Sequence, residues 1–479
     1  MDIFDALMTV LAIVLAIVSS FHALISKRDP KSAIGWIAFC VLIPFGGPFL
    51  YYIFGINRVR TRAEKLQRRS DVSRGEIKMP TDTPDIDSAI KDDDRTTGKH
   101  AELVHLSDTI TDRALVGGNH IEVLNNGEEA YPAMLDAIEN ARRSLFLTTY
   151  IFESNDTGKT FVDALAGAVK RGVDVKVIVD GLSDACSLNW CSRQLKKAGV
   201  PVARFLPPRL IPPTASINLR NHRKILVADG TIAFTGGINI GDRHLAERYD
   251  NPDRVVDMHF RLTGPVVQQI EKVFIDDWRF ITGIDTPPNP VEPKQAGSAL
   301  CRVITEGPNE DMDTLAMILA GAISAARESV VIMTPYFIPT RGLLAVLQAA
   351  ALRGLQVTII LPEKNDIRIL HWATRNLLWE LLERGVKIYY QPPPFVHTKL
   401  VIIDEYYTHI GSANIDPRSL RLNFELVVEI FDTPLAEILT KHVETVIEQS
   451  QPVTLEDVDG RSFPARLRDS LAWLLSPYL

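Results

Sequence analysis

The sequence predicts an α/β protein of two pseudo-symmetric α/β/α sandwich halves with an N-terminal membrane-embedded helical segment. Three observations support this fold class. Helical patterns alternate with short apolar strands, one histidine motif occurs twice, and two apolar runs open the chain of 479 residues. A formal net charge of −7 argues against nucleic acid as the main partner, because phosphate neutralisation needs a basic face.

The first apolar run, residues 6–25, has the length that a helix needs to cross the hydrocarbon core of a bilayer. Acidic residues precede this run and basic residues follow it, which is not the order of a cleaved signal peptide. We therefore expect a membrane anchor that is retained.

A second apolar run, residues 33–56, is interrupted by Pro-Phe-Gly-Gly-Pro at 44–48, which kinks a helix or turns it back. Either both runs cross the membrane, or the first crosses while the second dips in and returns. A buried hairpin of a soluble domain is the least favoured alternative. A basic set follows and, by the positive-inside bias, predicts that the remainder faces the cytoplasm: Arg58, Arg60, Arg62, Lys65, Arg68 and Arg69.

An internal repeat begins at about residue 116. Residues 141–150 correspond to 326–336, and residues 171–180 correspond to 353–362. Each segment has the pattern of a helix end that leads into a buried strand. Two such halves should pack with approximate two-fold symmetry, so that their equivalent histidines converge at one seam.

The duplicated motif supplies two identical sets of polar side chains. A histidine and a lysine separated by one residue point the same way on a strand. Two lysines and two asparagines suit the oxygens of a phosphate diester, while one imidazole attacks phosphorus and the other protonates the leaving alkoxide. Protonated lysines repel cations, so no metal or other cofactor is expected. The motif residues are His222, Lys224, Asp229 and Asn239, then His397, Lys399, Asp404 and Asn414.

Both copies resemble the HxKxxxxD motifs of the phospholipase D superfamily, and this resemblance covers residues 116–449. Segments 26–33, 44–48, 423–425 and 475–479 are similar to those of bacterial cardiolipin synthases. The resemblance implies a phospholipase D-like fold in a bacterial inner-membrane enzyme. It also implies that two phosphatidylglycerols condense into cardiolipin through a phosphatidyl-histidine, with release of glycerol.

The resemblance also implies a role for each motif residue. His222 would be the nucleophile, and His397 first the acid and then the base. Lysines and asparagines would hold phosphate oxygens. Asp229 and Asp404, although part of the catalytic motif, end their strands and are expected to brace the site. Family members place a carboxylate on the far nitrogen of each histidine, which assigns Glu425 to His397 and Asp257 to His222.

Other functions and one region stay open. A phospholipase D-type hydrolase would use the same pocket, and a non-catalytic membrane scaffold is a further alternative. Homo-oligomerisation is also open. The C-terminal tail could form either an amphipathic interfacial helix or an ordinary packed helix. The predicted organisation is a membrane anchor (1–57), a basic stretch and linker (58–115), the first half (116–285), a proline-rich linker (286–298), the second half (299–449) and the tail (450–479).

Overall fold

The computed structural model describes residues 3–27, 30–55, 101–111, 113–186, 191–208, 219–248, 250–292, 294–307 and 313–476. They belong to two compact units, Met1–Arg68 and Arg69–Leu479, and each unit is considered by itself. The predicted basic set at 58–69 and the predicted linker up to residue 100 lie outside the described residues.

The N-terminal unit is helical. It consists of α1 (Ile3–Ser26), α2 (Pro30–Leu42), α3 (Gly46–Leu50) and the π-helical turn η1 (Tyr51–Gly55). Among the described residues, α1 is the one helix that is long and apolar enough to cross a membrane. Its 24 residues span roughly 36 Å, against a hydrocarbon core of about 30 Å.

The second apolar run turns back on itself. Its α2 helix has 13 residues and is only roughly 20 Å long, too short to cross a bilayer. The turn is tight, because a Cβ on Gly47 would lie 2.3 Å from the carbonyl oxygen of Phe39. Beyond it, the Tyr51 ring packs 5.3 Å from that of Trp36, and its hydroxyl lies 2.8 Å from His22 Nδ1 of α1. The interruption at 44–48 therefore turns the chain back, one of the two outcomes expected for it, and the path of this run through the membrane stays a prediction.

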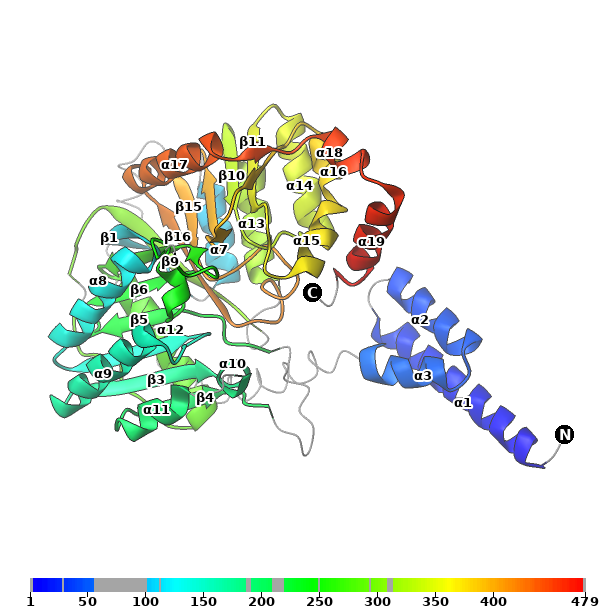
Figure 1. The fold of residues 1–479 in the computed structure, drawn as a ribbon, viewed down its shortest axis with the longest axis horizontal. Coiled ribbons are helices and arrows are strands. Elements are labelled where there is room, and N and C mark those ends of the chain that lie inside the picture. Colours follow the sequence, from blue (N-terminus) through cyan, green and yellow to red (C-terminus); the bar gives the residue numbers. More distant parts are fainter. Residues whose placement is uncertain are drawn as a thin grey trace. The chain divides into compact units, whose positions relative to one another are not determined.

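The second unit is built around one continuous sheet (Figure 1). From its outer edge inward, the first half contributes β4, β3, β2, β5, β6, β8 and β1, and the second half contributes β12, β11, β10, β14, β15, β16 and β9 in the equivalent order. The halves join where β1 and β9 pair antiparallel. The sheet strands are β1 (Val116–Asn125), β2 (Ser144–Thr149), β3 (Asp174–Asp180), β4 (Val202–Phe205), β5 (Ile225–Ala228), β6 (Ile232–Gly236), β8 (Met258–Thr263), β9 (Ala299–Glu306), β10 (Ser329–Met333), β11 (Gln356–Pro362), β12 (Lys387–Gln391), β14 (Leu400–Ile403), β15 (Tyr407–Gly411), β16 (Glu425–Phe431) and the short β17 (Gln451–Pro452) beside β12.

Helices cover both faces of this sheet (Figure 1). One face carries α8, α9 and α11 in the first half and α13 and α14 in the second, with α7 packed on α13. The other face carries α12 and α17 over a core that is continuous between the halves, in which Phe146 of β2 stacks on Phe274 of α12 at 4.9 Å. The helices are α7 (Ala101–Ile110), α8 (Asn126–Asn140), α9 (Asp156–Lys170), α10 (Gly181–Cys186), α11 (Cys191–Lys197), α12 (Val266–Thr282), α13 (Thr314–Ala325), α14 (Arg341–Leu352), α15 (Arg368–Arg375), α16 (Leu378–Leu382), α17 (Thr433–Glu448), α18 (Leu455–Asp459) and α19 (Phe463–Leu474).

The predicted fold class is confirmed. Each repeat segment found in the sequence becomes a strand in the same place of its half, and β2 and β10 are one such pair. Joining the halves through a single sheet was not predicted. It depends on β1 and β9, which come at the start of each half and pair across the junction.

Candidate active site

The two motif histidines meet at the seam between the halves. Their ring centroids lie 6.5 Å apart, and the side chains are buried, with 8% of His222 and 9% of His397 exposed. Neither histidine belongs to a strand. Each lies on an extended segment three residues before one, since β5 begins at Ile225 and β14 at Leu400.

The main chain of each histidine is bound to the opposite half. The His222 N–H donates to the Phe424 carbonyl at 2.9 Å, and the His397 N–H donates to the Val256 carbonyl at 2.8 Å. Beside His397, β7 (Val255–Val256) and β13 (Phe395–Val396) form a small parallel sheet across the seam. The residue after each acceptor carries a carboxylate, so these bonds bring that carboxylate beside the ring.

The carboxylates are therefore exchanged between the halves. His222 Nδ1 lies 3.0 Å from Glu425 Oε2, and His397 Nδ1 lies 2.7 Å from Asp257 Oδ2. The sequence-based assignment of Glu425 to His397 and Asp257 to His222 was wrong, because the crossing main chain places each carboxylate at the histidine of the other half. With Nδ1 donating to a carboxylate, Nε2 is the nitrogen of each ring left for chemistry.

Glu425 is held by several donors besides His222. Ser412 Oγ donates to its Oε2 at 2.5 Å, and Asn423 Nδ2 donates to its Oε1 at 3.2 Å. Burial alone would raise the pKa of Glu425. His222, Lys224 and the hydroxyl of Ser412 outweigh burial and hold this pKa below its usual value.

Asp257 has a sparser environment. Its Oδ1 accepts from the Met258 N–H at 2.8 Å, and burial raises its pKa. The position equivalent to Ser412 is Gly237, where a Cβ would come within 2.2 Å of Asp257 Oδ1. Only glycine leaves room there for the carboxylate beside His397.

The two lysines are buried beneath the histidines. Lys224 Nζ donates to the His222 carbonyl at 2.7 Å, and Lys399 Nζ donates to the His397 carbonyl at 2.5 Å. Burial lowers the pKa of Lys224 to about 7 and that of Lys399 to about 8, although Glu425 and Asp257 oppose this shift. An anion that enters the pocket would raise both pKa values again.

The histidines are also shifted toward the neutral form. Burial lowers the pKa of His222, and Glu425 partly opposes the effect. Burial and the neighbouring lysines Lys399 and Lys224 lower the pKa of His397 well below its usual value. Both pKa shifts favour the neutral form of the imidazoles.

The asparagines lie in equivalent loops after β6 and β15. Asn239 Oδ1 accepts from the Ile151 N–H at 3.2 Å, which leaves its amide N–H groups to donate elsewhere. Asn414 is buried, and its Oδ1 has no hydrogen-bond partner among the described residues.

Asp229 and Asp404 are remote from the imidazoles. Each follows the strand that its histidine precedes, in a tight turn at φ 54° and 52°, so seven residues of extended chain separate it from the histidine by roughly 20 Å. Three consecutive main-chain N–H groups bind each carboxylate, those of residues 142–144 for Asp229 and those of residues 327–329 for Asp404. Both aspartates brace the start of the neighbouring strand and do not reach the pocket, although the motif grouped them with the catalytic residues.

Sequence reasoning missed several side chains around the histidines. The Tyr150 ring packs edge-on against His222 at 5.0 Å, and Phe395 lies 6.0 Å from His397. A third imidazole, His244, lies 6.4 Å from His397, and its Nε2 accepts from the Asn239 N–H at 3.2 Å. Tyr150 and Tyr336 occupy equivalent positions in the two repeat segments, and this match could have pointed to a tyrosine near each histidine. No pattern pointed to His244.

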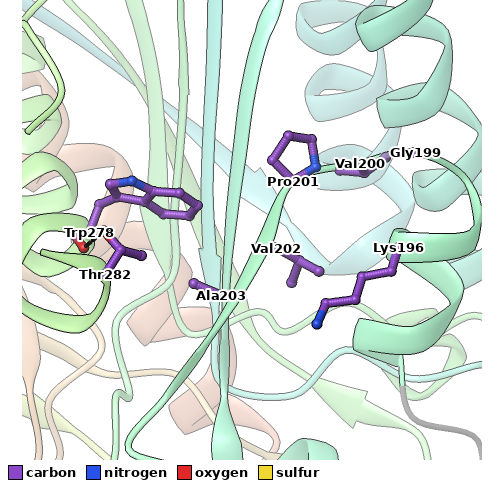
Figure 2. Close-up of a pocket in the computed structure, with 8 residues that line it drawn as sticks. All are labelled: Lys196, Gly199, Val200, Pro201, Val202, Ala203, Trp278 and Thr282. Atoms are coloured by element: carbon purple, nitrogen blue, oxygen red, sulfur yellow. Dashed lines mark hydrogen bonds between the residues drawn. The ribbon is translucent and has the colours of Figure 1, made fainter. Parts of the chain in front are cut away.

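A separate hollow lies away from this pocket. It is bordered by α11, β4 and α12, where Lys196 and Val202 face Trp278 and Thr282 (Figure 2). None of its lining residues belongs to the histidine site. The chemistry predicted from the motif therefore concerns the seam and not this hollow.

Comparison with known proteins identifies the family to which this chain belongs. The family profile described as "Cardiolipin synthase, PLD-like domain" matches residues 134–278 and 319–447, and "Phospholipase_D-nuclease N-terminal" matches residues 14–55. Major cardiolipin synthase ClsA of Bacillus subtilis (strain 168) is 30% identical over 99% of this chain and 98% of its own length. Cardiolipin synthase of Geobacillus thermodenitrificans (strain NG80-2) is 31% identical over 100% of this chain and 94% of its own length.

The fold also resembles a solved structure. The crystal structure of phosphatidylserine synthase from Haemophilus influenzae Rd KW20 superposes with a TM-score of 0.62 at 17% sequence identity. The match covers 79% of this chain and 100% of that one. At this identity the likeness concerns the fold.

Proposed function

The chain belongs to the bacterial cardiolipin synthases of the phospholipase D superfamily, and we propose that it moves a phosphatidyl group from one phosphatidylglycerol to a second, releasing glycerol. The observation that carries this proposal is the seam itself. Two imidazoles face each other at 6.5 Å, each tied through Nδ1 to a carboxylate, above two buried lysines.

In the first step, Nε2 of His222 attacks phosphorus. An N–P bond forms, the P–O bond to the glycerol headgroup breaks, and His397 gives its proton to the departing glycerol oxygen. The ring separation leaves room for one phosphorus between the imidazoles, with reacting atoms about 3–3.5 Å apart. Binding of the anionic diester raises the depressed pKa of His397, so that this ring can carry the proton.

In the second step, His397 acts as a base. It takes the proton from a glycerol hydroxyl of the second phosphatidylglycerol, whose oxygen attacks phosphorus as the N–P bond to His222 breaks. The products are cardiolipin and free His222, and the proton returns to His397. Glu425, kept anionic by its donors, stabilises the positive charge that His222 carries while it is phosphorylated.

The lysines and asparagines hold the phosphate oxygens. Lys224 and Lys399 become fully protonated beside the anion and balance the negative charge that grows in the transition state. The free N–H groups of Asn239 and Asn414 add neutral hydrogen bonds. Each half contributes one lysine and one asparagine, at equivalent positions of the motif.

The helix α1 supports a membrane location for the reaction, because it keeps the site near the phospholipid. We propose that the protein lies in the inner membrane and that its second unit, which carries the histidines and is called the catalytic unit below, faces the cytoplasm. The basic residues that follow the second apolar run support this orientation. Protease digestion of sealed right-side-out vesicles should leave the catalytic unit intact. Digestion from the outside would contradict this orientation.

The decisive assay uses the purified full chain with phosphatidylglycerol labelled separately in its acyl chains and in its headgroup. A synthase releases labelled glycerol and forms cardiolipin in equal amounts. A hydrolase of the same scaffold would form phosphatidic acid as its main product, and that outcome would refute the proposal. The His222→Ala, His397→Ala double variant is the control, and it should form neither product.

A further inference from the structure

The C-terminal helix α19 uses one side to bind the catalytic unit. Asp469 and Ala472 on this side are buried. The Asp469 carboxylate accepts from Arg468 at 2.6 Å and from Arg461, and Arg375 of α15 lies 3.9 Å away. Arg468 also lies over the Trp372 ring of α15 at 4.6 Å. The helix is therefore fixed in place, beside α15 (Figure 1).

The opposite side of α19 is apolar and uncovered. At 3.6 residues per turn, the four exposed large apolar side chains of α19 fall within an arc of about 80°, on the side away from Asp469 and Ala472. No other described part of the catalytic unit covers them. They form the α19 stripe, and their exposed fractions are 77% for Phe463, 49% for Leu467, 55% for Leu471 and 62% for Leu474.

The α19 stripe belongs to the part of the fold that reaches the active site. The helix α15 starts two residues after Asp366, whose carboxylate accepts from the Tyr336 hydroxyl at 2.8 Å. The Tyr336 ring lies 6.5 Å from Phe395, and Phe395 lies 6.0 Å from His397. A continuous series of contacts thus connects the helix under α19 with the catalytic histidine.

We infer that the α19 stripe inserts into the surface of the lipid bilayer and holds the catalytic unit there. An exposed row of aromatic and leucine side chains on a pre-formed helix suits the interface between headgroups and acyl chains. The exposed Arg466 on the same helix complements anionic headgroups. The chain already enters the membrane through α1, so a second contact would fix the orientation of the pocket relative to its lipid substrate.

The inference deepens the proposed function, because it states how the pocket meets the lipid, yet it can be tested without measuring catalysis. In the full chain, the exposed Cys186 is replaced by serine, which leaves the buried Cys40, Cys191 and Cys301. A fluorophore is then attached at Leu467→Cys or, as a control, at Glu437→Cys on the exposed side of α17. Both proteins are placed in phosphatidylglycerol-containing vesicles whose acyl chains carry bromine as a quencher.

We expect the probe at position 467 to be quenched several-fold more by brominated lipid than the probe at position 437, and to be shielded from aqueous iodide. Equal lipid quenching at both positions would overturn the inference. Shielding from both lipid and iodide would also overturn it, because protein would then cover the stripe, either the N-terminal unit or a second copy. Circular dichroism of each labelled protein checks that it is folded.

A kinetic test separates docking from chemistry. The Leu467→Ser, Leu471→Ser double variant should lower turnover of vesicle phosphatidylglycerol roughly tenfold, while turnover of a dispersed short-chain phosphatidylglycerol stays unchanged. Leu352→Ser, at a leucine of α14 that is 69% exposed, is the matched control and should change neither rate. An equal loss on both substrates would overturn the inference. If the protein made no cardiolipin at all, the proposed function would be wrong. The quenching experiment would still test whether the α19 stripe inserts into the bilayer.

Discussion

The two halves of the catalytic unit share strand order and motif, yet they surround their histidines differently. His222 faces Glu425, which also binds the hydroxyl of Ser412 and the amide of Asn423. His397 faces the shorter Asp257, and Gly237 takes the place of Ser412. A duplicated motif thus gives a symmetric frame with two chemically distinct imidazoles, as a reaction with one nucleophile and one acid requires.

The two motifs also differ at the residue that separates the histidine from the lysine. In the first half this residue is Arg223, a buried cation that pairs with Asp277 of α12 at 2.6 Å and donates to the Glu425 carbonyl at 3.0 Å. In the second half it is the neutral Thr398. The segment that carries His222 is therefore tied both to its own half and to the opposite one, which favours a fixed position for the nucleophile.

The largest expected effect comes from the histidines themselves. His222→Asn and His397→Asn should each lower turnover by about 10⁴-fold or more, because each removes a group that takes part in bond making or proton transfer. The proteins should differ in what they accumulate. Denatured His397→Asn protein should retain covalently bound lipid label and His222→Asn protein should not, and the reverse pattern would make His397 the nucleophile.

The carboxylates should come next, with losses of roughly 10²–10⁴-fold for Glu425→Gln and Asp257→Asn. Glu425 raises the pKa of His222 against the effect of burial. Its neutralisation should lower that pKa, so the acid limb of the kcat/KM profile, where His222 becomes protonated, should move to lower pH. Asp257→Asn should leave this limb in place. The test is the kcat/KM profile of each variant measured from pH 4 to 8. Equal shifts of the acid limb in both variants would contradict distinct roles for the two histidine–carboxylate pairs.

The Gly237 and Ser412 positions should give an intermediate effect. Gly237→Ala places a methyl group against Asp257 and should cost roughly 100-fold in kcat, because the carboxylate must leave His397. Ser412→Ala removes one donor to Glu425 and should cost roughly tenfold. Steady-state kinetics with matched melting curves separate these effects from unfolding. A larger loss of kcat in Ser412→Ala than in Gly237→Ala would contradict this order.

The smallest effect should appear at alkaline pH. The lysines bind phosphate when protonated, and burial lowers the pKa of Lys224 to about 7 and that of Lys399 to about 8. As pH rises through these values the charge is lost, so kcat/KM should decline above about pH 7 and more steeply above about pH 8. Lys224→Arg keeps its charge and should remove the earlier part of the decline. An unchanged profile in this variant would show that another group titrates.

Local patterns in the sequence predicted the repeated strands, both motifs and the membrane helix, because short-range periodicity and spacing determine them. They did not predict the exchange of Glu425 and Asp257. Distance along the chain does not determine which histidine a carboxylate will contact. Here the main-chain hydrogen bonds to the Phe424 and Val256 carbonyls determine the pairing. His244 was missed for a similar reason, since it ends the short 3-10 helix η3 (Asp242–His244), which is too short to give a periodic pattern in the sequence.

The exchanged carboxylates also have a consequence for biosynthesis. The ribosome makes α1 and the first half well before residue 425, so the growing chain can enter the membrane while His222 still lacks Glu425 and His397 does not yet exist. During this time the His222 imidazole has neither its carboxylate nor its proton donor. The nascent chain should therefore leave the surrounding phospholipids intact until the second half has been translated and has folded against the first.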